Sequence, residues 1–63
     1  MSKLDGFDQQ DQERIKTLMC KLVEGQIDRG EIDCTDEAIK AAMPRAFADA
    51  RATIIAVNEY LCG

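Results

Sequence analysis

The sequence predicts an all-α fold: an antiparallel hairpin of two helices that associates as a small helical-bundle dimer. Apolar residues recur in two long stretches with a period of about 3.6 residues, which places them on one face of a helix. No stretch shows the strict alternation of apolar and polar residues that is typical of a strand. A short connection with turn residues separates the two stretches and brings two long helices back antiparallel. We therefore expect the 63 residues to form one helical domain.

The first helix is expected over about residues 8–29, after a short polar lead at residues 1–7. We expect the lead to be flexible, with Leu4 or Phe7 contacting the helices. Asp8 is a suitable N-terminal cap, because a carboxylate accepts hydrogen bonds from the first free backbone N–H groups. The broad apolar face of this helix consists of Ile15, Leu18, Met19, Leu22, Val23 and Ile27.

The connection begins where Arg29 is followed by Gly30, because glycine readily adopts the left-handed conformation that ends a helix. Asp33 or Thr35 can cap the second helix, which we expect over about residues 34–62. Its apolar stripe consists of Ile39, Met43, Phe47, Ala50, Ile54, Val57 and Leu61. Of these, Phe47, Ile54 and Leu61 are expected to be buried against Ile15, Leu18 and Leu22.

Pro44 lies inside the second helical pattern, where proline costs about 3 kcal/mol by removing a hydrogen bond and clashing with the preceding turn. One interpretation is a single helix kinked at residues 43–44. The other is two helices, the later one with proline in its first turn. The apolar stripe keeps its phase across Pro44, which favours the kinked helix.

A second face of this helix carries small residues, Ala41, Ala48 and Ala52, together with Ile55. Small residues let helix backbones approach closely, so this face is either a close-packed helix seam or a surface for a partner. One short antiparallel helix cannot cover both this face and the apolar stripe. Chains this short also need a disulfide framework, a metal or self-association to be stable, and self-association as a homodimer is the solution we expect.

The chemistry of the side chains argues against a metal, a cofactor and catalysis. The chain has no histidine, and its three cysteines form no pair with zinc-ligand spacing. Residues 30–36 match the second half of a calcium loop, but Gly25, Ile27 and Arg29 occupy the positions that should supply ligands in the first half. Cys20 lies at the margin of the first apolar face and is expected to pack as a small hydrophobe. We therefore predict a protein that is not an enzyme.

Charge and hydropathy narrow the range of functional classes that remain for this protein. The net charge of −4 comes from 12 acidic and 8 basic residues, with no basic run for non-specific nucleic-acid binding. No apolar run has the length of a membrane span, and no signal peptide is recognisable. Free thiols without an export signal indicate the cytoplasm, and we expect no membrane partner.

The length and the two-helix plan are similar to those of the Rop family of small RNA-binding proteins. Members of that family dimerise into four-helix bundles. The similarity is one of architecture and covers no motif, so it implies a dimeric hairpin and no particular function.

The function we expect is that of a small cytoplasmic interaction module, which regulates or inhibits a larger protein by docking helices on it. By association with other very small acidic helical proteins, we expect a phage-, plasmid- or regulatory-type gene product. The residues expected to contact the partner are Arg45, Ala48, Ala52, Ile55, Glu59 and Tyr60. The alternative is a dimeric RNA- or DNA-binding regulator that uses the sparse basic set Arg14, Lys21, Arg45 and Arg51.

Overall fold

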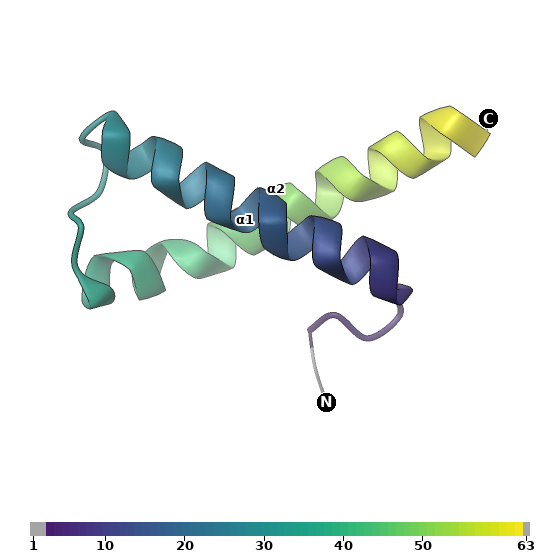
Figure 1. Cartoon of the computed structure of the whole chain (residues 1–63), viewed down its shortest axis with the longest axis horizontal. Helices are drawn as coiled ribbons and strands as arrows, with labels where there is room; N and C mark the ends of the chain where they lie inside the picture. Colours follow the sequence, from purple (N-terminus) through teal and green to yellow (C-terminus); the bar gives the residue numbers. More distant parts are fainter. Residues whose placement is uncertain (1–2, 63) are drawn as a thin grey trace.

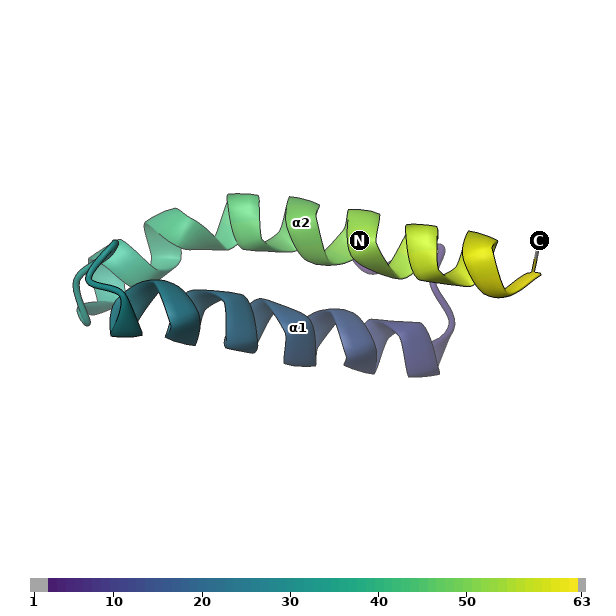
Figure 2. The ribbon, with the colours of Figure 1, turned by 90° about the horizontal axis from the view of Figure 1, so that it is seen from above.

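A computed structural model describes residues 3–62, which form two α-helices and no strand. Helix α1 spans Gln9–Asp28 and helix α2 spans Asp36–Cys62. The helices are antiparallel and pack on each other as a hairpin, which confirms the all-α class. Figure 1 shows that they cross near their middles, in the form of an X, and Figure 2 shows them as two layers.

The ends of α1 are set by local hydrogen bonds. Asp8 is the N-terminal cap, since its Oδ1 accepts a bond of 2.8 Å from the backbone N–H of Asp11. At the other end Gly30 has a φ of 75°, in the left-handed region that favours glycine. The N–H of Gly30 donates to the carbonyl of Ile27, and the N–H of Glu31 donates to the carbonyl of Gln26. This pair of bonds is a Schellman motif, which stops the helix and turns the chain.

Helix α2 begins after Thr35, which provides its cap instead of Asp33. The Thr35 Oγ1 accepts a bond of 3.2 Å from the N–H of Ala38, and its carbonyl accepts one of 2.9 Å from the N–H of Ile39. The helix then runs without interruption to Cys62, with Pro44 inside it. The interpretation of two separate helices is therefore wrong.

The core lies where the helices cross. Ile15 of α1 and Ala50 of α2 are fully buried, and Ile54 is nearly so. Six partly buried residues pack around them: Leu4, Phe7, Leu18, Met19, Leu22 and Phe47. Val23 and Ala46 are also buried, on the side of the crossing toward the connection. The core is therefore short and centred, and does not extend along the full length of α2.

The lead contributes to this core. The side-chain amide of Gln12 donates to the carbonyls of Leu4 and Phe7, at 3.3 and 3.0 Å. The N–H of Phe7 also donates to the carbonyl of Leu4. These bonds hold residues 4–7 in a turn whose two apolar side chains pack against the helices.

The expectations about the burial of Leu61 and Cys20 are wrong, and the one about Phe47 is met only in part. Leu61 is 72% exposed, because α2 has diverged from α1 by the time the apolar stripe reaches it. Phe47 is only partly buried, at the edge of the core. Cys20 is exposed as well, like Cys34 and Cys62, so it does not pack as a small hydrophobe.

Candidate protein-interaction surface

Ala48 and Ala52, at the centre of the set of residues expected to contact a partner, lie on the side of α2 that faces away from α1. Ala48 and Ala52 are each two residues from buried Ala50, and two residues turn a helix by about 200°. Five of the six expected residues are exposed, and Ile55 is partly buried. We call the set Arg45, Ala48, Ala52, Ile55 and Glu59 the outward face. The structure thus brings the expected residues onto one helix, with Tyr60 at the edge of their face.

The outward face is not a seam between the two helices of the hairpin. That seam forms on Ala46 and Ala50, which are 3% and 0% exposed. Small side chains at this point let α1 approach α2 closely where they cross. Sequence reasoning missed Ala46, although it precedes Ala50 by four residues and so shares the face of the apolar stripe.

The C-terminal end of α2 leaves large apolar side chains uncovered. Val57, Tyr60 and Leu61 are 42%, 84% and 72% exposed. Figure 1 shows α2 diverging from α1 toward this end, where Asn58 still donates a hydrogen bond to Asp11 of α1. We call these three residues the C-terminal apolar patch. Isolated apolar residues on a surface are ordinary, whereas a cluster at the end of one helix indicates a contact surface.

A groove of about 490 Å³ lies on another side of the molecule. It is lined by Lys3, Leu4, Met19, Lys40, Met43, Pro44 and Phe47. We call it the apolar groove. The sequence placed Met43 and Phe47 on the apolar stripe, but only the fold brings the lead and α1 beside them.

The charged groups lie at the surface, and no charged or polar residue among those described is buried. Asp11 pairs with Arg14 at 3.6 Å and accepts a bond of 3.0 Å from the side-chain amide of Asn58. The Asn58 bond joins α1 to the C-terminal half of α2. Arg29 pairs with Glu31 in the connection. Within residues 3–62, no group of acidic or cysteine side chains is arranged to hold a metal ion.

Among the basic residues of the nucleic-acid alternative, Arg45 lies apart from Arg14 and Lys21. Arg14 and Lys21 line a hollow together with Leu18 and Ile54. Arg45 lines a different hollow, beside Gln26 and Ile32. Arg14 is also engaged by Asp11, which lowers the positive charge that it offers to a phosphate.

Neither α1 nor α2, over the residues that the structure describes, is apolar enough along its length to cross a lipid bilayer. Comparisons of the chain with protein families, with curated proteins and with solved structures found no match. The inferences that follow therefore depend on the geometry and chemistry of this chain alone.

Proposed function

We propose that this protein is a small non-enzymatic interaction module that docks α2 on a larger protein and so regulates or inhibits it. The observation that supports this most is the outward face. It runs along α2 from Arg45 to Glu59, with small residues at its centre and a charge at each end. A helix surface of this kind suits close packing beside a helix of another protein.

Self-association as a homodimer is part of the proposal. The accessible surface of the chain is 4897 Å², whereas a compact monomer of 7.0 kDa exposes about 4,000 Å². The excess is close to the roughly 800 Å² that each partner buries in a stable interface of standard size. We assign the C-terminal apolar patch to the contact with the second copy. Val57 and Leu61 continue the apolar stripe of α2 beyond the part that α1 covers. The cytoplasmic location remains part of the proposal, on the strength of three free thiols.

Substitution of Ala52 by arginine tests the outward face. Ala52 is exposed and lies opposite the side of α2 that packs on α1, so the variant should keep its helicity and melting midpoint. It should lose the partner that the tagged wild-type protein captures from lysate of its own cells, because arginine adds bulk and charge at the centre of the face. Thr17→Arg, on the exposed side of α1, adds the same side chain elsewhere and should retain the partner.

Retention of the partner by Ala52→Arg would contradict the proposed docking face. The salt dependence of capture addresses the nucleic-acid alternative in the same experiment. Capture that weakens steeply with salt and disappears after nuclease treatment would favour the RNA- or DNA-binding regulator. A protein interface with an apolar centre should respond little to either treatment.

A further inference from the structure

The apolar groove has one continuous wall on α2. Lys40, Met43, Pro44 and Phe47 follow the spacing i, i+3, i+4, i+7, so they form one side of two successive helical turns. Two turns extend for about 11 Å, which is close to the diameter of an α-helix with its side chains. The opposite wall comes from Met19 of α1 and Leu4 of the lead. The groove is therefore of a size to receive one helix laid across it.

The walls are held in place by the core. Leu4, Met19 and Phe47 all pack against the buried cluster around Ile15. The carbonyl of Leu4 also accepts hydrogen bonds from the side chain of Gln12 and from the N–H of Phe7. The groove thus exists before any partner binds, and little ordering cost remains to be met on binding.

The apolar lining of the groove is adaptable. Met19 and Met43 are unbranched and polarisable, so their thioether chains adjust to the shape of a bound apolar side chain. Phe47 adds a flat aromatic surface, and Pro44 adds a rigid ring. These groups favour leucine, isoleucine or phenylalanine from a partner over a polar ligand.

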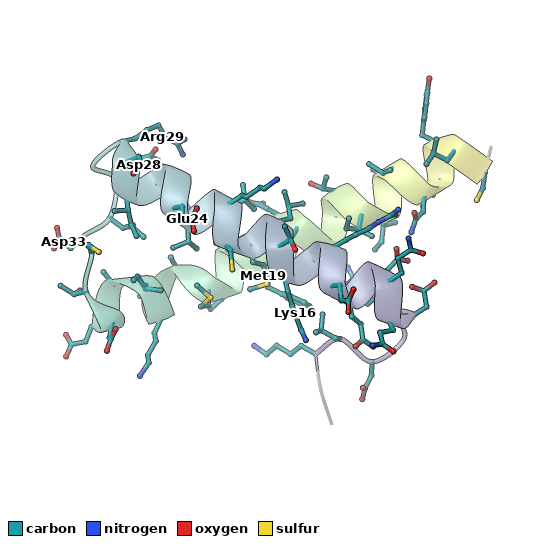
Figure 3. The ribbon with its side chains drawn as sticks, viewed as in Figure 1. Lys16, Met19, Glu24, Asp28, Arg29 and Asp33 are labelled. Carbon is teal, nitrogen blue, oxygen red and sulfur yellow. The ribbon has the colours of Figure 1, made fainter. Side chains whose placement is uncertain are left out.

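The charged residues that line the groove have a sign opposite to the net charge of the chain. The net charge is −4, yet the charged residues lining the groove are two lysines, Lys3 and Lys40. Figure 3 shows Lys16 on the same side of α1 as Met19, which adds a third ammonium group nearby. The ion pairs among residues 3–62 join arginines to acids and involve none of these lysines. Their charge is therefore available to an external acid.

From this combination we infer that the apolar groove binds an acidic amphipathic helix of a partner protein. Two or three apolar side chains of that helix enter the groove between Met19 and Met43. Its glutamate or aspartate residues flank the apolar side chains and meet Lys3 and Lys40. The site is separate from the outward face of α2, and the inference stands independently of the docking proposed for that face.

A designed peptide provides the direct test. The probe is an eighteen-residue amphipathic helix with leucine on one face and glutamate on both flanks, and its partner probe carries lysine at every glutamate position. Fluorescence anisotropy should show that the glutamate peptide binds the wild-type protein at least about tenfold more tightly than the lysine peptide. Amide chemical shifts of the isotope-labelled protein should change at Lys40, Met43 and Phe47, and not at Ala48 or Ala52.

Charge reversal in the groove supplies the matched variants. Lys3→Glu combined with Lys40→Glu should weaken the glutamate peptide by about tenfold or more and should strengthen the lysine peptide. The control combines Lys21→Glu with Arg51→Glu, which changes the net charge equally at exposed positions outside the groove. The control should alter both affinities much less. Ala52→Arg should leave peptide binding unchanged. A result that contradicts the proposed docking at the outward face can therefore be told apart from one that contradicts peptide binding in the groove.

Three results would overturn the inference. The first is equal affinity for the glutamate and lysine peptides, and the second is an equal effect of the groove and control variants. The third is a pattern of chemical-shift changes that does not report the peptide in the groove. Such a pattern is either changes at residues outside the groove, or changes produced by decanoate and not by the glutamate peptide. That last result would assign the groove to a single-chain anionic amphiphile instead of a helix.

Discussion

Gln26 shows how one side chain can limit the stability of so small a core. Its Oε1 is buried and has no hydrogen-bond partner among the residues described. An unsatisfied buried acceptor costs about 1–3 kcal/mol, because the water that it loses on folding is not replaced. The neighbouring hollow is lined by the apolar residues Ile32, Ala41, Ala42 and Pro44, and by Arg45, which makes no hydrogen bond to this oxygen.

We therefore predict that Gln26→Met stabilises the protein by about 1 kcal/mol. Methionine has similar length and helix propensity, so the change removes the unsatisfied oxygen without opening a cavity. Urea unfolding followed by circular dichroism measures the difference. Gln10→Met makes the same substitution at an exposed position of α1 and should change the free energy of unfolding by less than about 0.5 kcal/mol. Loss of stability in the Gln26 variant alone would show that this oxygen is satisfied in solution.

Pro44 affects the stability of helix α2 as a whole. Proline has no N–H, so the carbonyl of Lys40 lacks the hydrogen bond that an unbroken α-helix would give it. The helix nevertheless continues on both sides of Pro44, and Phe47 in the next turn packs against the core. The kink that the sequence predicts at this point remains a prediction about the shape of α2.

Pro44→Ala should stabilise the free protein by about 2 kcal/mol. The restored hydrogen bond and the relieved clash contribute about 3 kcal/mol, and the more flexible unfolded chain offsets up to about 1 kcal/mol of this. Thermal unfolding measures the gain, and Thr17→Ala in the middle of α1 reports the part that comes from helix propensity alone. A lower melting midpoint for Pro44→Ala would mean that proline suits its local backbone, as it would in the first turn of a separate helix.

In the whole molecule, the crossing of the two helices determines which residues are buried. An X-shaped hairpin concentrates its buried residues at one point and leaves the arms of both helices partly uncovered (Figure 1). This arrangement differs from a bundle whose helices lie side by side for their whole length, as in the family that the two-helix plan resembles. A second copy that covers the C-terminal apolar patch would extend the core along α2.

The mass of the protein in solution tests whether it forms the proposed dimer. Light scattering at micromolar concentration should give about twice the chain mass of 7.0 kDa. Leu61→Glu should shift the protein toward the monomer, since a carboxylate in an apolar interface is not solvated. Leu61 is 72% exposed in the single chain, so the substitution should not disturb the hairpin itself. Thr17→Glu adds the same charge on α1 and should remain dimeric. A wild-type monomer that unfolds cooperatively would contradict the dimer.

The sequence by itself determined the features that depend on neighbours along the chain. The cap at Asp8, the stop at Gly30 and the apolar phase of α2 through Pro44 all follow from local hydrogen bonding and the helical period. These interactions span at most a few residues, so composition and spacing are enough to predict them. The helical period also places Ala52 on a different face from the apolar stripe, but the sequence left open whether that face is a helix seam or a free surface.

Only the tertiary structure decided how far the stripe is covered. Periodicity gives the direction of Leu61 around α2, but its burial depends on the crossing of the two helices. The crossing in turn depends on how Ala50 and Ile54 fit against Ile15, which is a matter of shape between distant segments. The apolar groove has the same origin, since Lys3 and Lys40 come together only because the lead folds back on the core. Sequence spacing carries no information about such contacts, because they are set by packing between elements.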